Sequence, residues 1–95
     1  MSNYWNEAPQ QNLFKKNDLI EIIKNTRGRH KLPRAEKGKN YLVISYYTNN
    51  MGTTKYIVID TSGQQYFTTE KSAKKITNFD LSKSQDWQSA KRSWM

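Results

Sequence analysis

The chain contains no cysteine, so it forms neither disulfide bonds nor thiolate metal sites. It has one histidine, and its eight acidic residues are spread along the sequence rather than clustered as metal ligands. No apolar run approaches the roughly 20 residues that a helix needs to cross a bilayer. Residues 1–12 lack the basic start and apolar middle of a secretory signal. We therefore expect a cytoplasmic protein that needs no cofactor and makes no contact with a membrane.

Motifs of catalysis are also missing from the sequence. It contains no glycine-rich phosphate loop, no serine elbow and no HExxH pair. His30 lies among cations that would lower its pKa, and no nearby carboxylate would orient it as a general base. A loop residue that donates one hydrogen bond or contacts a phosphate is the better interpretation of His30. These observations predict a protein that is not an enzyme.

Positive charge is abundant and concentrated. The 16 lysines and arginines exceed the acids by eight, and residues 24–39 hold seven of these cations but only one acid, Glu36. A polyanion would relieve the repulsion among them by neutralising charge and releasing condensed counterions. The alternative is a solvated loop that aids solubility or guards a sheet edge. The loop predicts nucleic-acid binding through Lys24, Arg27, Arg29, His30, Lys31, Arg34, Lys37 and Lys39.

Several short segments have the β-branched and aromatic composition of strands. They are residues 19–23, 41–47, 53–59 and 64–68. Residues 16–18, 48–52 and 60–63 contain the asparagine, aspartate and glycine typical of tight turns. A helix is the alternative for the first segment, because its apolar residues also fall at helical spacing. Three consecutive strands with short turns predict a meander that, with the first strand, curls into a small SH3-like antiparallel β-barrel.

The two ends of the chain differ from this strand-rich middle. Residues 1–12 are polar and predict a flexible arm, on which Tyr4 and Trp5 either pack against the barrel or stack on bases. Residues 70–76 predict a helical turn, and Ser82 with Gln85 resembles a capping box for a short C-terminal helix. The predicted organisation is an arm over 1–12, a barrel over 13–69 and a helical tail over 70–95.

Two aromatic pairs have alternative roles. Trp87 and Trp94 share one face of the predicted C-terminal helix, where packing against the barrel is favoured over contact with a partner. In the strand over 41–47 we expect Leu42 and Ile44 to point inward. This leaves Tyr41 and Tyr47 outside, where they either stack on unpaired bases or pair across the sheet with tyrosines of neighbouring strands, Tyr56 or Tyr66.

The order of these segments resembles the KOW-type SH3-like barrels of ribosomal and transcription-elongation proteins. The resemblance covers residues 13–69 and rests on residues 14–22, Gly28 and residues 33–38, followed by an apolar strand. Asn17 and Ala35 stand where that family has glycine. The resemblance implies a barrel that binds nucleic acid or a protein partner through its loops. The small size and the composition, rich in lysine and asparagine, also resemble phage-encoded host-takeover factors.

Taken together, these patterns predict a non-catalytic protein that binds duplex DNA with little sequence specificity. RNA is the other possible nucleic acid, and modulation of host transcription or of the nucleoid is the expected role. Arginines that reach a narrow minor groove would add a preference for A·T-rich duplex. The alternative function is a protein-interaction module that docks on an acidic surface of RNA polymerase or the ribosome. If the chain is phage-encoded, its expected location is the host cytoplasm.

Overall fold

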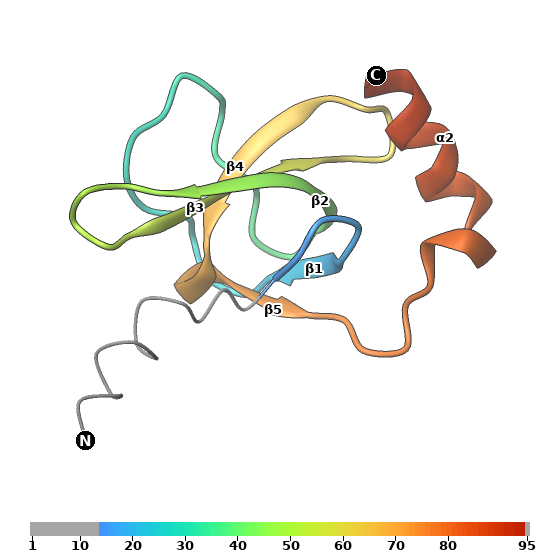
Figure 1. Cartoon of the computed structure of the whole chain (residues 1–95), viewed down its shortest axis with the longest axis horizontal. Coiled ribbons are helices and arrows are strands. Elements are labelled where there is room, and N and C mark those ends of the chain that lie inside the picture. Colours follow the sequence, from blue (N-terminus) through green and yellow to red (C-terminus); the bar gives the residue numbers. More distant parts are fainter. Residues whose placement is uncertain (1–13, 95) are drawn as a thin grey trace.

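A computed structural model describes residues 14–94, so the predicted N-terminal arm lies outside the described part of the chain. These described residues are mainly β, with five strands, two 3-10 turns and one short helix (Figure 1). The strands are β1 (Leu19–Ile22), β2 (Asn40–Thr48), β3 (Thr54–Ile59), β4 (Gln65–Thr69) and β5 (Ala73–Lys75). The 3-10 turns are η2 (Glu70–Ser72) and η3 (Leu81–Lys83), and the helix is α2 (Gln85–Trp94).

All strand pairings in the sheet are antiparallel, in the order β4-β3-β2-β1-β5. Strands β2, β3 and β4 form the predicted meander, and the short turn η2 carries the chain from β4 across to β5 beside β1. This order, with a 3-10 turn before the last strand, is that of an SH3-like barrel and confirms the predicted fold class. The segment that begins at Leu19 is a strand and not a helix.

The barrel interior is a compact apolar cluster. Its largest members are Phe14, Ile20, Tyr41 and Tyr56, and the rings of Phe14 and Tyr56 meet edge to face at 5.0 Å. Burying an aliphatic or aromatic side chain of this size contributes about 1.5–3 kcal/mol, so this cluster contributes substantially to stability. The barrel is thus a firm support for the long loop between β1 and β2.

A second apolar cluster lies on the outer side of β2 and β3, beneath α2. Leu42, Ile44, Ile59 and Ala90 are buried there, and the half-buried indoles of Trp87 and Trp94 pack against them. This confirms that the two tryptophans pack on the barrel. Helix α2 approaches closely at the β3–β4 turn, where a Cβ added to Gly63 would lie 3.0 Å from the Cβ of Ser93.

The predicted orientation of β2 is wrong for Tyr41, Leu42 and Ile44. Tyr41 is 1% exposed and lies in the barrel interior, whereas Leu42 and Ile44 are buried in the second cluster under α2. The register between β2 and β3 shifts between Val43 and Ser45, which marks a β-bulge. Alternation holds from Tyr41 to Ile44, so the prediction took the wrong face as the inner one, because α2 covers the face of Leu42 and Ile44. The bulge reverses the alternation only in the second half of β2. The cover provided by α2, which alternation alone does not reveal, therefore accounts for the wrong placement of Tyr41.

The tail also departs from the prediction. Residues 70–76 begin as the turn η2 but end as the edge strand β5, which pairs with β1. The predicted cap at Ser82 does not start α2, because the side chain of Asp80 instead accepts hydrogen bonds from the backbone N–H and hydroxyl of Ser82 in η3. No helix in residues 14–94 is long and apolar enough to cross a membrane.

Candidate nucleic-acid interface

The basic loop of residues 24–39 is anchored to the barrel by a buried threonine pair. The hydroxyl of Thr26 donates to the carbonyl of Ala35 at 3.2 Å and lies 2.9 Å from the hydroxyl of Thr68 on β4. Thr26 is 5% exposed and Thr68 is fully buried, so both hydroxyls depend on this contact for hydrogen bonding. The anchor ties the two arms of the loop to each other and to the sheet.

The returning arm of the loop covers the free edge of β4. Phe67 donates its N–H to Pro33 O and accepts at its own carbonyl from Ala35 N, both at 2.9 Å. Arg34 and Phe67 form an isolated parallel bridge at the same place. An open edge strand invites pairing with another chain, and this arm satisfies the backbone groups of β4 there. The loop therefore does guard an edge, as the alternative interpretation of its role proposed, while its cations remain exposed.

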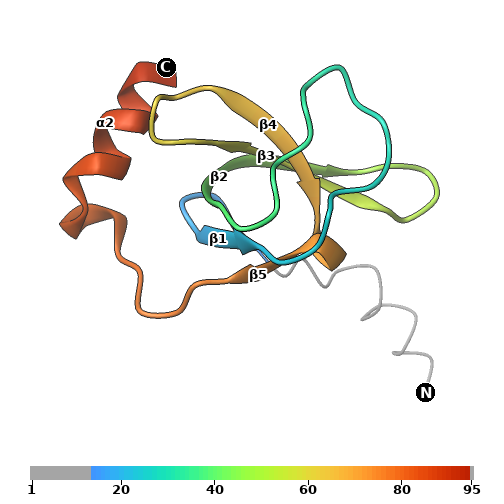
Figure 2. The ribbon, with the colours of Figure 1, turned by 180° about the vertical axis from the view of Figure 1, so that it is seen from behind.

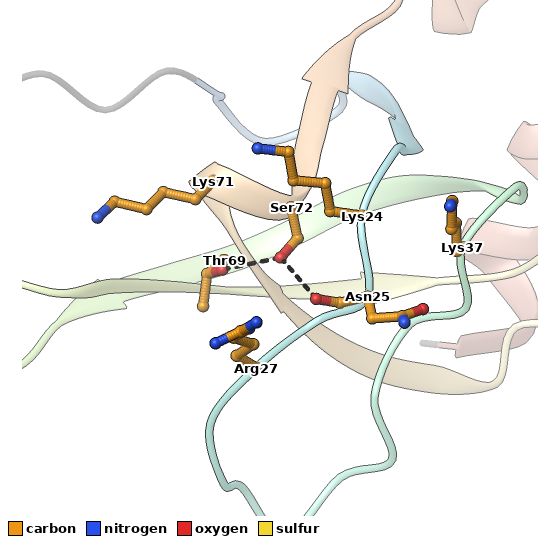
Figure 3. Close-up of a pocket in the computed structure, with 7 residues that line it drawn as sticks. All are labelled: Lys24, Asn25, Arg27, Lys37, Thr69, Lys71 and Ser72. Atoms are coloured by element: carbon orange, nitrogen blue, oxygen red, sulfur yellow. Dashed lines mark hydrogen bonds between the residues drawn. The ribbon is translucent and has the colours of Figure 1, made fainter.

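An open hollow lies between the first arm of the loop and the turn η2 (Figure 3). Its volume is about 600 Å³, and we call it the basic hollow. Its lining residues are Lys24, Asn25, Arg27, Lys37, Thr69, Lys71 and Ser72. The buried Ser72 hydroxyl donates to Asn25 O at 3.4 Å and lies 3.3 Å from the Thr69 hydroxyl, which joins η2 to the loop.

The charges around the basic hollow all have one sign. Lys24, Arg27, Lys37 and Lys71 contribute four cations, and none of its described lining residues is acidic. In Figure 3 the side chain of Lys24 extends above Ser72, that of Lys71 points to the left, and Arg27 lies below Thr69. A concave surface with one sign of charge concentrates its potential and attracts anions.

Two further hollows continue the basic hollow around the loop. One contains Asn25, Arg34 and Lys37, and the other runs from Arg27 and Lys71 to Lys55 on β3. Each of these neighbours holds one described acid as well, Glu36 in the first and Glu70 in the second. The continuous surface follows the base of the loop, and its positive charge is greatest at its centre.

Two of the predicted site residues are engaged within the loop. The guanidinium of Arg34 donates from Nε and Nη2 to the carbonyl of Gly28, at 3.0 and 2.9 Å, and so joins the two arms. Lys39 Nζ lies 2.6 Å from the carboxylate of Glu36, which raises the pKa of Lys39. Arg34 thus shapes the loop, and the charge of Lys39 is neutralised locally.

The tip of the loop holds Arg29, His30 and Lys31. The ring of His30 stacks on Phe67 at 5.2 Å and lies 6.2 Å from the ring of Tyr47, which is exposed as predicted. Burial lowers the pKa of His30, and the nearby charges of Lys55 and Lys31 lower it further. Neutral His30 accepts a hydrogen bond at Nδ1 from the N–H of Leu32, so the ring is part of the structure of the loop.

Tyr41, predicted as a stacking residue, is unable to take that role. Its ring packs edge-on against Tyr66 at 5.1 Å inside the barrel, and its hydroxyl accepts a hydrogen bond from Glu36 N at 2.9 Å. Burial raises the pKa of its hydroxyl. Packing on Tyr66 is the alternative that the sequence left open. Tyr41 therefore supports the loop from within the barrel.

Sequence reasoning missed Lys71 and Lys55 as members of the site. Lys71 reaches the basic hollow from η2, and Lys55 Nζ donates to the carbonyl of Arg29 at 2.6 Å from β3. Both lie outside the charged segment, and only the pairing of strands brings them to it. The remaining predicted residues divide into Lys24, Arg27 and Lys37 in the basic hollow and Arg29, His30, Lys31 and Tyr47 at the tip.

Comparison with protein-family models, curated protein sequences and solved structures finds no match to the chain. Within residues 14–94, no group of three or more histidine, cysteine or acidic residues is placed to hold a metal ion.

Proposed function

We propose that this protein is a non-catalytic binder of duplex DNA that contacts phosphates through the basic loop and η2, with little sequence specificity. The observation that carries the proposal is the basic hollow, which four cations from two separate segments line without an acid among the described lining residues. Repulsion among these cations is unfavourable in the free protein and is relieved when phosphates neutralise them.

The arginine and the lysines of the basic hollow would contact phosphates in different ways. Arg27 presents a planar fork suited to two oxygens of one phosphate, whereas Lys24, Lys37 and Lys71 act as mobile point charges. Phosphate contacts position a protein on a duplex but do not distinguish base sequences. The proposed binding is therefore mostly independent of sequence.

The proposal is tested by titrating the full chain against random duplex DNA, matched single strand and duplex RNA at several salt concentrations. Four neutralised phosphates, at about 0.9 each, predict a slope of log affinity against log salt of about −3.6 for duplex DNA. Affinity would then fall roughly 150-fold between about 50 and about 200 mM salt.

The pattern of binding separates the proposal from its alternatives. Tighter binding to single strands or RNA would move the assignment to those ligands. Failure to bind any nucleic acid at low salt would overturn the proposal and favour docking on an acidic protein surface, such as that of RNA polymerase or the ribosome.

A further inference from the structure

The hairpin between β2 and β3 ends in a turn with internal order. Asn49 Oδ1 accepts hydrogen bonds from the N–H groups of Met51 and Thr53, at 2.9 and 3.0 Å. The backbone carbonyl of Asn49 accepts from Gly52 N at 3.0 Å, and Gly52 has a φ of 83°. The left-handed region suits glycine, so this residue closes the turn without strain. The tip is therefore preorganised before any partner arrives.

This ordered tip presents an apolar side chain to solvent. Met51 is 89% exposed, the highest value among the exposed large hydrophobic residues of the described chain. A single exposed apolar residue is common on protein surfaces and has no meaning by itself. Its setting is informative here, because residues 48–54 carry no charge. They border a hollow that Arg27, Lys55 and Lys71 also line.

The hairpin and the basic loop line a common hollow. A hollow of about 370 Å³ is lined by Gly52, Thr53 and Lys55 of the hairpin and by Arg27 and Lys71, which also line the basic hollow. Both projections lie at the end of the molecule away from α2 (Figures 1 and 2). Phosphates held by Arg27 and Lys71 would therefore place the grooves of the same duplex beside the hairpin tip.

We propose that the tip of the β2–β3 hairpin enters the minor groove of bound duplex DNA and that Met51 wedges between base pairs and kinks the duplex. This inference rests on the proposed function. Methionine is among the apolar side chains that unstack base steps from the minor groove, and such wedges act beside cations that hold the flanking phosphates. The flexible, unbranched side chain of Met51 also adapts to an irregular gap between bases.

The test measures binding and distortion in the same samples. A short duplex with several flexible TA steps carries 2-aminopurine in these steps and a fluorophore pair at its ends. The full chain should raise the 2-aminopurine fluorescence and the energy transfer between the ends. Met51→Ala should abolish both signals at saturating protein while affinity falls by less than about tenfold, because the lost apolar contact is offset by the unstacking that no longer occurs.

Two controls make the result specific. Met51→Leu keeps an apolar wedge and should retain both signals, and Thr61→Ala alters an exposed position of the β3–β4 turn and should leave binding and distortion unchanged. Salt-dependent binding without distortion, or equal distortion by Met51→Ala, would overturn the wedge and leave the proposed function standing. Absence of duplex binding by the parent would overturn both.

Discussion

Replacing Thr26 by valine tests whether the threonine anchor holds the basic loop on the barrel. Valine has nearly the same shape but lacks the hydroxyl, so the carbonyl of Ala35 and the hydroxyl of Thr68 each lose a hydrogen-bond partner. Leaving a buried polar group unsatisfied costs about 1–3 kcal/mol. Taking the lower end for both groups, we expect Thr26→Val to reduce the free energy of unfolding by about 2 kcal/mol.

Urea denaturation measures this loss. With an m-value of about 1–2 kcal/mol/M for a chain of this size, the midpoint should fall by about 1–2 M. The double variant Thr26→Val with Thr68→Val removes both hydroxyls together, so its loss should be smaller than the sum of the single losses by about 1 kcal/mol. Thr77→Val changes an exposed threonine and serves as the control. A loss below about 0.5 kcal/mol for Thr26→Val would refute the anchor.

Two further predictions concern the close approach of α2 and the single histidine. Gly63→Ala places a Cβ 3.2 Å from the carbonyl oxygen of Ala90, at a φ of +86° that disfavours alanine. We expect α2 to be displaced and the free energy of unfolding to fall by about 1–3 kcal/mol, as measured by near-ultraviolet circular dichroism and urea denaturation. An unchanged spectrum and an unchanged denaturation midpoint would contradict the contact. The pKa of His30 is lower in the folded than in the unfolded chain, so the unfolded state binds the proton more tightly, and stability should decline as pH falls from the unfolded pKa near 6.5 toward the lowered folded pKa. Denaturation midpoints measured at pH values across this window test the direction of the change in stability. His30→Gln is the control and should abolish the decline.

The strands were predictable wherever local chemistry agreed with tertiary structure. Strand β2 is rich in branched and aromatic residues, and Asp60 and Gly63 carry the signature of a tight turn, so both features were evident. Strand β5 has only three residues, Ala73 and two lysines, and no alternation distinguishes it from a helical turn. Its strand geometry depends on pairing with β1, which is distant in the sequence.

The candidate site was predictable in its charge but not in its arrangement. The density of lysine and arginine over 24–39 located the surface, yet the basic hollow also needs Lys71, which η2 supplies from a distant part of the chain. Tyr41 was misplaced because α2 buries the outer face of β2, so that the apolar residues Leu42 and Ile44 lie outside the barrel interior. Arg34 was predicted to contact phosphate, but its guanidinium donates to the carbonyl of Gly28, and this contact depends on how the loop folds back on itself.

The most direct test of the central claim compares the salt dependence of two charge-matched variants. Arg27→Ala with Lys71→Ala removes two cations of the basic hollow, whereas Lys83→Ala with Arg92→Ala removes two exposed cations near α2. Each lost phosphate contact lowers the slope by about 0.9, so the first variant should show about −1.8 and the second should keep the parent value of about −3.6. Equal slopes for the two variants would contradict binding through the basic hollow.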